Sequence, residues 1–436
     1  MQTASKKVVN GWAMYDWANS TYSLVITSTI FPMYYTFVTP NPIILFGRTF
    51  DRDALASYAI SLSFLIIAIL SPVLSSIADY KGNKKSFMKF FCYLGSLACC
   101  LMFFFTKDNI GFGLFLSIVA SIGYCGSIVF YNAYLPEIAA EEDQDRVSAK
   151  GFALGYIGSV ILMIACLALI FMTKDSDFGK QFWPEKISFV LVGIWWTGFA
   201  QITFSRLPPS KASERRPEHS ILTNGFHELK KVWNQLQHHP VLKRYLLSFF
   251  FYNMGVQTVM YMATYFAAGE IKMESTQLII TILIIQLVAI GGAYLFSILS
   301  KATNNIFSLA VLVICWIGIC IGAYFTKTAF EFYFLAFAVG MVMGGIQSIS
   351  RSTYSKFLPE THDTASYFSF YDVCDKIGTV IGTLSFGYVA EVFGGMRNSV
   401  LALMTYFIIG FILLMFVRRK KDNTRAAFEP QIVTAI

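Results

Sequence analysis

Three charged residues, Asp372, Asp375 and Lys376, lie close together in an otherwise apolar stretch near the end of the chain. Spacings of three and four residues place Asp375 and Lys376 on the same helical face as Asp372. Only 14 residues separate Lys376 from the next charge, Glu391, and as a helix they span roughly 21 Å, less than the ~30 Å hydrocarbon core of a bilayer. If this stretch crosses a membrane, Lys376 therefore lies inside it. Ionisable groups in that position usually mark a path for a substrate or an ion.

The first apolar stretch is also unusually polar. It contains Asp16 and Asn19, followed by the hydroxyl side chains of Ser20, Thr21, Tyr22, Ser23, Thr27, Ser28 and Thr29. So many hydrogen-bonding groups argue against lipid contact along that face. Because Asp16 lies near the start of the stretch, a position at the membrane interface is the alternative to a cavity position. We take Asp16 and Asn19 as candidate cavity residues, and Asp16 or Asp375 as the candidate carrier of a proton or another cation.

Amide side chains in other apolar stretches add candidate ligand-binding groups, namely Asn132, Asn253, Gln257 and Gln347. Each could hydrogen-bond a polar ligand, although buried amides in membranes more often hold helices together. The three charges near the C-terminus have a structural alternative as well, a self-neutralising cluster at the membrane edge with the helix tilted or the bilayer thinned. Gly340 and Gly344, four residues apart, predict close helix packing rather than chemistry.

Composition places the chain among polytopic membrane proteins. Of its 436 residues, charged residues make up 14% and hydrophobic residues 56%, so charge usage is about half of that in soluble domains. Windows of about 20 mostly apolar residues recur along the whole chain and predict an all-α membrane protein with twelve transmembrane helices. The predicted helices cover 14–38, 56–78, 87–106, 110–134, 150–173, 187–206, 244–268, 276–299, 305–326, 330–350, 367–390 and 397–417.

The polar connections alternate in charge. Most Lys and Arg residues fall in every second connection, and the long connection between the sixth and seventh helices is among these. The positive-inside rule then places both termini on the cytoplasmic side of a multi-pass membrane protein.

That long connection, 207–243, carries Leu222, Phe226, Leu229, Trp233 and Leu236 at helical spacing, which predicts an amphipathic helix on the inner membrane surface. It separates two six-helix halves, 1–206 and 244–417, and a cytoplasmic tail follows at 418–436. The halves are faintly similar, since Leu135-Pro136-Glu137 and Leu358-Pro359-Glu360 end their fourth helices. Such pseudo-symmetric halves are typical of secondary transporters, whose binding sites lie between the repeats.

The connection after the second helix reads Asp79-Tyr80-Lys81-Gly82-Asn83-Lys84-Lys85. An acidic helix end, a glycine turn and a basic cluster resemble the signature loop of the major facilitator superfamily. Asp79 could cap or pair with neighbouring helix ends when the cytoplasmic side closes, and release them when it opens. An ordinary basic cytoplasmic turn is the alternative. The candidate gating residues are Asp79, Gly82, Lys84, Lys85, Arg146 and Arg351.

Several longer motifs resemble the autophagy-related vacuolar effluxer family of the same superfamily. They are Trp12-Ala13-Met14-Tyr15-Asp16-Trp17-Ala18-Asn19-Ser20, Phe130-Tyr131-Asn132-Ala133-Tyr134-Leu135-Pro136-Glu137, Gly151-Phe152-Ala153-Leu154-Gly155, Gly344-Gly345-Ile346-Gln347-Ser348-Ile349-Ser350-Arg351-Ser352 and Phe370-Tyr371-Asp372. The resemblance implies a twelve-helix transporter with the major facilitator fold. Fungal members are associated with release of amino acids from the vacuole, and prokaryotic members mostly lack an assigned substrate. Met254 stands where relatives often carry an acid, which leaves the coupling ion open.

We therefore expect a secondary transporter that moves a small polar metabolite, an amino acid by resemblance, through alternating access with ion coupling. The expected partners are the lipid bilayer, the substrate and protons or a cation, with no nucleic acid, cofactor or metal. We expect a monomer in the cytoplasmic membrane of a bacterium.

Two other classes of protein are alternatives to a transporter. A polytopic lipid-modifying enzyme needs a catalytic set, but the chain has no His-Glu-x-x-His helix, no P-loop and no Gly-x-Ser-x-Gly elbow, and its five histidines all lie in polar connections. A transport-inactive sensor or scaffold would bind a ligand without carrying it.

The buried charges lead to a first prediction. Asp375→Asn should abolish ion-coupled flux in proteoliposomes while the protein stays folded, because the substitution keeps the side-chain shape and removes the titrating group. Full transport activity of this variant would remove Asp375 from the mechanism.

Overall fold

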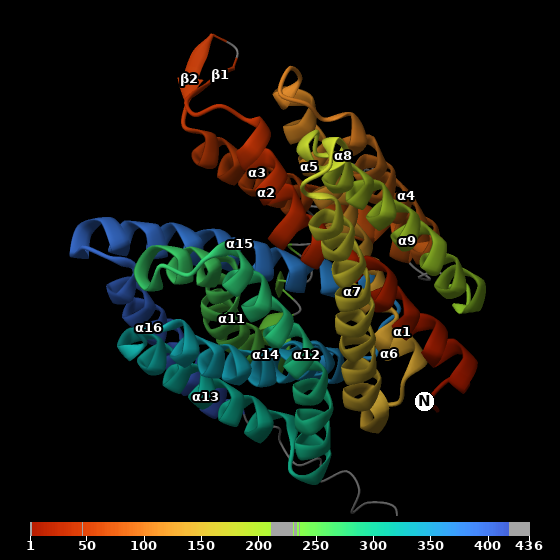
Figure 1. Ribbon diagram of the computed structural model, residues 1–436. Helices are drawn as coiled ribbons and strands as arrows, with labels where there is room; N and C mark the ends of the chain where they lie inside the picture. Colours follow the sequence, from red (N-terminus) through yellow and green to blue (C-terminus); the bar gives the residue numbers. More distant parts are fainter. Residues whose placement is uncertain (1, 46, 211–229, 231–232, 235, 418–436) are drawn as a thin grey trace, which may run out of the picture.

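The computed structural model describes residues 2–45, 47–210, 230, 233–234 and 236–417 (Figure 1). The predicted tail 418–436 and most of the predicted linker helix lie outside these residues. Within them, each predicted transmembrane window after the first coincides with one long helix, whereas the first, 14–38, is covered by three successive helical segments. The helices before the linker are α1 (Lys6–Thr21), α2 (Phe31–Val38), α3 (Arg52–Lys81), α4 (Lys84–Leu101), α5 (Ile110–Ala133), α6 (Leu135–Ile138), α7 (Gln144–Thr173), α8 (Asp177–Lys180) and α9 (Trp183–Arg206).

The helices after the linker continue the same pattern. They are α11 (Pro240–Phe266), α12 (Ser275–Ala302), α13 (Asn305–Phe325), α14 (Ala329–Phe357), α15 (Thr364–Phe393) and α16 (Met396–Met415). The 3-10 segments η2 (Met102–Phe104) and η3 (Glu141–Asp143) and the π segment η4 (Ala267–Ile271) adjoin helix ends. A short antiparallel hairpin of β1 (Ile43–Leu45) and β2 (Arg48–Phe50) follows α2, with Ile44 opposite Thr49. The sequence analysis did not anticipate this hairpin.

Nine of the described helical segments are long and apolar enough to cross a membrane, and they contain α3, α4, α5, α7, α9, α12, α13, α14 and α16. The stretch from α1 to α2, α11 and α15 are not among the nine. These three carry the candidate residues Asp16, Asn253 and Lys376. Because polar groups in a bilayer must find partners within the protein, these helices depend on their neighbours most.

The first helix starts at Lys6, eight residues before the predicted window, and its middle is not an α-helix. The π segment η1 (Tyr22–Ile30) separates α1 from α2. Within it, the hydroxyls of Ser28 and Thr29 donate to backbone carbonyls five residues earlier, at 2.9 and 3.0 Å. Pro32, which lacks an N–H, follows directly. Part of the predicted polar stretch thus hydrogen-bonds backbone carbonyls of the π segment.

The helices gather into two groups (Figure 1). In the first helix group, α1 to α9, α1 packs against α7 and α9, and α4 against α5 and α9. In the second helix group, α11 to α16, α12 packs against α14, and α11 against α15 and α16. The groups meet where α7 contacts α12 and α14, and where α15 contacts α3 and α5. The predicted boundaries of the halves at 1–206 and 244–417 stay a prediction.

Small residues bring α12 and α14 close together. A Cβ atom added to Gly344 would overlap the carbonyl oxygen of Ala289, and one added to Gly292 would overlap that of Met341. Backbone atoms cannot move aside as the end of a side chain can. The two helices therefore depend on glycine at these positions for their separation.

This packing predicts opposite effects at two adjacent positions of α12. Gly292→Ala should lower the free energy of unfolding of the purified protein by about 1–3 kcal/mol, because the added methyl group overpacks the contact. Its unfolding midpoint should fall accordingly. Gly291 is the matched control, because nothing lies within 4 Å of a Cβ atom there. Gly291→Ala should leave the midpoint unchanged or raise it slightly through helix propensity. Equal effects of the two substitutions would contradict the close contact.

Candidate functional site

The charged residues of α15 meet two amides of α11. The ammonium nitrogen of Lys376 lies 2.7 Å from Asp375 Oδ2 and 3.7 Å from Asp372 Oδ1. Asn253 and Gln257 both donate to Asp375 Oδ1, at 2.6 and 2.9 Å. Five residues predicted from separate motifs thus form one group, the Lys376 cluster. Both α11 and α15 belong to the second helix group.

The Lys376 cluster faces the first helix group. Lys376 lies 5.3 Å from the ring centre of Phe64 in α3, and α15 packs against α3 and α5. The side chains of Lys376, Asp375 and Asp372 are only 15%, 13% and 9% exposed. Asp372 Oδ2 is buried and has no hydrogen-bond partner among the described residues. This carboxylate oxygen can therefore accept a hydrogen bond from a ligand donor.

A second cluster, the Asp16 cluster, joins the two helix groups. The guanidinium of Arg351 in α14 donates from Nη1 and Nη2 to Asp16 Oδ2 of α1, each at 3.3 Å. Tyr131 of α5 donates its hydroxyl to the same oxygen at 2.7 Å. Arg351 also donates to the side chain of Asn132 at 3.3 Å and, through Nε, to Ser148 Oγ at 2.9 Å. Asp16 is thus buried in the contact between the two helix groups, with 7% of the residue exposed.

The third cluster, the Asp79 cluster, lies around the loop between α3 and α4. Asp79 accepts from the backbone N–H groups of Ala365 and Ser366, at 3.1 and 2.8 Å, in the first turn of α15. These are donors that a helix leaves unpaired, so Asp79 caps α15 from another helix. Lys84 is fully buried, lies 3.0 Å from Asp79, forms an ion pair with Glu137 and donates to Thr364 Oγ1 at 2.6 Å. The cluster ties α3, α4 and α6 to α15.

A fourth cluster, the Asp145 cluster, also joins the two helix groups and was not predicted from the sequence. Asp145, at the start of α7, lies 2.7 Å from the ammonium of Lys356 in α14. It also accepts from Ser300 and Asn305, each at 2.7 Å, at the end of α12 and the start of α13. In sequence Asp145 resembles a solvated charge after an acidic run. Nothing in the sequence around Asp145 indicates that it faces the connection from α12 to α13.

Other partners in these clusters were also missed, namely Tyr131, Glu137, Ser148 and Thr364. Of the remaining candidates, Gln347 accepts from Tyr156 at 2.6 Å, and Asn19 is buried, with its Oδ1 3.5 Å from Ser20 Oγ. Gly82 turns the chain with a φ of 62°. Arg146 has an exposed side chain and pairs with Asp143 three residues earlier. Lys85 is partly buried. These five residues stand outside the four clusters.

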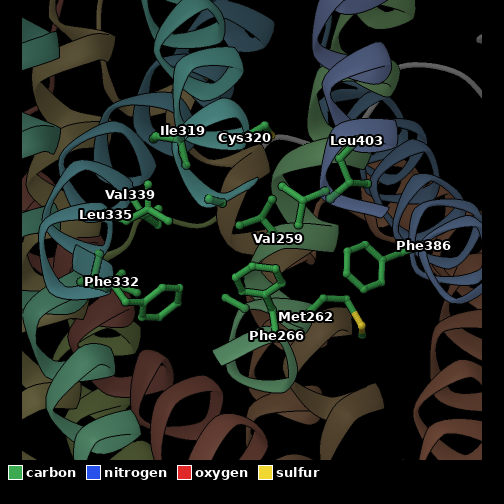
Figure 2. A pocket seen from close by; sticks show the side chains of 15 residues that line it. Val259, Met262, Phe266, Ile319, Cys320, Phe332, Leu335, Val339, Phe386 and Leu403 are labelled. Atoms are coloured by element: carbon green, nitrogen blue, oxygen red, sulfur yellow. The ribbon is translucent and has the colours of Figure 1, made fainter. Parts of the chain in front are cut away.

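Two cavities also lie away from the clusters. The first has a volume of about 50 Å³ within the second helix group, and its lining includes Val259, Phe266, Phe332, Phe386 and Leu403 (Figure 2). No charged or amide side chain lines it, so it does not suit a polar ligand. The second is polar and lies beside the start of α15, between His238, His239, Glu360 and Asp363. Among the described residues, no group of three His, Cys, Asp or Glu side chains is placed to hold a metal ion.

The Asp79 cluster predicts a strong effect of its cation. Lys84→Met leaves the buried Asp79 and the nearby Glu137 without their shared ammonium, which should destabilise the protein by about 3–5 kcal/mol. The unfolding midpoint of the purified protein measures this. Lys85→Met is the control, since Lys85 is only partly buried and has no ion pair among the described residues, and it should stay within about 0.5 kcal/mol. Similar midpoints for both variants would show that the Asp79 cluster adds nothing to stability.

Comparison with known proteins places the chain in a family. The family described as "Vacuole effluxer Atg22 like" matches residues 4–427. The chain is 31% identical to the uncharacterized MFS-type transporter YxiO of Bacillus subtilis over 412 residues, which covers 94% of this chain and 95% of that protein. It is 25% identical to autophagy-related protein 22 of Yarrowia lipolytica over 467 residues, with 87% and 78% covered.

Solved structures agree on the fold. The fucose:proton symporter FucP of E. coli superimposes with a TM-score of 0.67 at 16% identity, covering 95% of this chain and 98% of that one. The human organic anion transporter TETRAN gives a TM-score of 0.68 at 11% identity, covering 94% and 99%. At such identities the likeness shows the fold alone. It confirms the predicted all-α membrane architecture, and the family match confirms the resemblance and excludes the enzyme alternative. The chain is a multi-pass membrane protein, a transporter of the major facilitator superfamily, and it belongs to the Atg22-like vacuole effluxer family.

Proposed function

We propose that this transporter carries a small polar metabolite by alternating access, coupled to a proton or another cation, and that the Lys376 cluster is its ligand site. The observation that carries the proposal is an ammonium held between two carboxylates in the buried face between the helix groups. A buried ion pair gives little net stability, because desolvation offsets the attraction between the charges. Its position in the middle of α15 is therefore better explained by function than by folding.

The chemistry of the cluster favours a zwitterionic substrate. Lys376 offers a cation to a ligand carboxylate, and the unpaired Oδ2 of Asp372 offers an acceptor to a ligand ammonium. The amides of Asn253 and Gln257 provide further hydrogen-bonding groups beside them. An amino acid carries both a carboxylate and an ammonium. The family description of a vacuole effluxer and the bacterial relative support export across the cytoplasmic membrane of a bacterium.

The Asp16, Asp79 and Asp145 clusters serve as the gate in this proposal. Each joins the first helix group to the second, and helix direction puts the latter two at the same end of the molecule, which charge distribution predicts to be cytoplasmic. Opening that end requires these bonds to break while the two halves, 1–206 and 244–417, rock about the ligand site. Gly82, Lys85 and Arg146 have no bond to the opposite group among the described contacts, so they have a lesser part in the gate.

Asp16 and Asp375 are the two candidate carriers of the coupling ion, and they would act on different steps. A proton on Asp16 weakens a bond between the helix groups, because it removes the counter-charge of Arg351. A proton on Asp375 weakens a bond within the second group, between α11 and α15. The first would act on the gate and the second on the ligand site.

A thermal-shift screen of the purified protein against amino acids and related metabolites, followed by counterflow in proteoliposomes, tests this function. A ligand should raise the unfolding midpoint of the wild type. Lys376→Gln should weaken its binding by roughly 10- to 100-fold, since a charge-assisted hydrogen bond is lost. The exposed Lys107 supplies the control, Lys107→Gln, which should bind as the wild type does. Binding without counterflow would instead favour the sensor alternative, and equal binding by Lys376→Gln would refute the site.

A further inference from the structure

The groups that hold Arg351 share an unusual property, because all of them belong to the first helix group. Asp16 and Trp12 come from α1, Tyr131 and Asn132 from α5, and Ser148 and Phe152 from α7. Arg351 itself comes from α14 in the second group. We call the six residues the Asp16 cage. The cage is thus a complete receptor on one helix group, and the cation that fills it belongs to the other.

The polar atoms of the Asp16 cage match a planar, forked donor. Nε of Arg351 donates to Ser148 Oγ and Nη2 donates to the Ser148 carbonyl, both at 2.9 Å. Nη1 donates to Asn132 Oδ1, and both terminal nitrogens donate to Asp16 Oδ2. All three guanidinium nitrogens therefore have acceptors on the first helix group. An ammonium, with its donors on one nitrogen, could not reach this set of acceptors at once.

Aromatic rings complete the Asp16 cage. The guanidinium carbon lies 4.1 Å from the ring centre of Phe152, 4.9 Å from that of Trp12 and 5.4 Å from that of Tyr131. All three are within the ~6 Å over which a cation is attracted to a ring face. A Cβ atom added to Gly151 would overlap Asp16 Oδ2 and crowd Arg351 Nη2. The cage therefore encloses a guanidinium with no space for a side chain at position 151.

Withdrawal of α14 leaves the Asp16 cage with a buried carboxylate and no counter-ion, which is costly in a low-dielectric site. A proton could neutralise Asp16, but it would leave Asn132, the Ser148 carbonyl and the three rings without the cation that they surround. A ligand with the same planar donor arrangement as Arg351 satisfies all of them. The ligand and Arg351 would then exclude each other.

We propose that the Asp16 cage is a binding site for a guanidinium or amidinium group of a small ligand, which enters from the predicted cytoplasmic side when Arg351 withdraws. In this view Arg351 is a built-in competitor that fills the site while that side is closed. The inference rests on the proposed transport function, since it needs a state in which the helix groups separate. The ligand class is set by the cage itself, independently of the Lys376 cluster.

Chemical rescue of the full-length Arg351→Ala variant tests the proposal. Methylguanidinium chloride at millimolar concentration should raise the unfolding midpoint of the purified variant by roughly 2 °C, and the rise should saturate. Sodium chloride and methylammonium chloride at equal ionic strength should not. The wild type should not respond, because Arg351 occupies the cage. The double variant Arg351→Ala with Asp16→Asn should lose the response.

Lys356→Ala is the matched control, because it removes another cation between the helix groups whose partner, Asp145, has no recorded cation–ring contact nearby. Methylguanidinium should not stabilise this variant. If Arg351→Ala cannot be isolated, Arg351→Gln serves in its place, with the same expected rescue. Absence of a saturable rise, or an equal rise in the Asp16→Asn double variant or in Lys356→Ala, overturns the proposal. The rescue measures binding and not transport. Rescue of Arg351→Ala together with absence of counterflow in the wild type would therefore refute the transport function alone.

Discussion

A charge in an apolar medium needs a partner, and the arrangement of this transporter follows from where those partners come from. Asp16 and Asp145 are nearly fully buried and pair with cations across the contact between the helix groups. Asp79 is equally buried, pairs with Lys84 of its own group and accepts backbone N–H bonds from α15 of the other. Asp375 is paired within the second group. The desolvation cost is therefore met in two ways, one that depends on the two groups being together and one that does not. Partners on the opposite helix group are lost if the two groups separate, whereas partners on the same group are kept.

The Asp79 and Asp145 clusters show how the two helix groups are joined at one end of the molecule. Asp79, at the end of a helix of the first group, bonds to the first turn of α15, and Asp145, at the start of a helix of the first group, bonds to the connection after α12. Each set combines a carboxylate, a lysine and small polar side chains at helix ends. Two such contacts, one with α15 and one with the connection between α12 and α13, resist rotation of one group against the other better than one would. Each bond is short-ranged, so a small separation of the helices releases it.

The polar interior contains two different cation environments, a guanidinium surrounded by rings in the Asp16 cage and an ammonium between two carboxylates in the Lys376 cluster. Arg351 is surrounded by three aromatic faces and by acceptors, whereas Lys376 has one ring, Phe64, and two carboxylates. A guanidinium spreads its charge over a plane and tolerates contact with rings, and an ammonium concentrates its charge and needs oxygen partners. The chemistry of each site therefore follows from which of the two cations it was built around.

Much of the fold could be read from the sequence, because a transmembrane helix is a local property. Runs of about 20 apolar residues placed the helical segments, and the polar stretches around Asp16, Asn253 and Lys376 marked the helices that need neighbours. Motifs spread over the chain identified the family, and spacing within α15 put its charges on one face. The π segment after Thr21 and the hairpin after α2 depend on backbone geometry that hydropathy does not encode.

The pairing of distant charges was decided only by the tertiary structure. Arg351 lies 335 residues from Asp16 in sequence, and Lys356 lies 211 from Asp145. Nothing in either neighbourhood indicates which helix will face it, because a side chain's partner depends on the rotation and height of packed helices. Local hydrogen bonds and hydropathy determine that a segment is a helix, whereas the contact between helices determines whether an aspartate caps, pairs or stays open to a ligand.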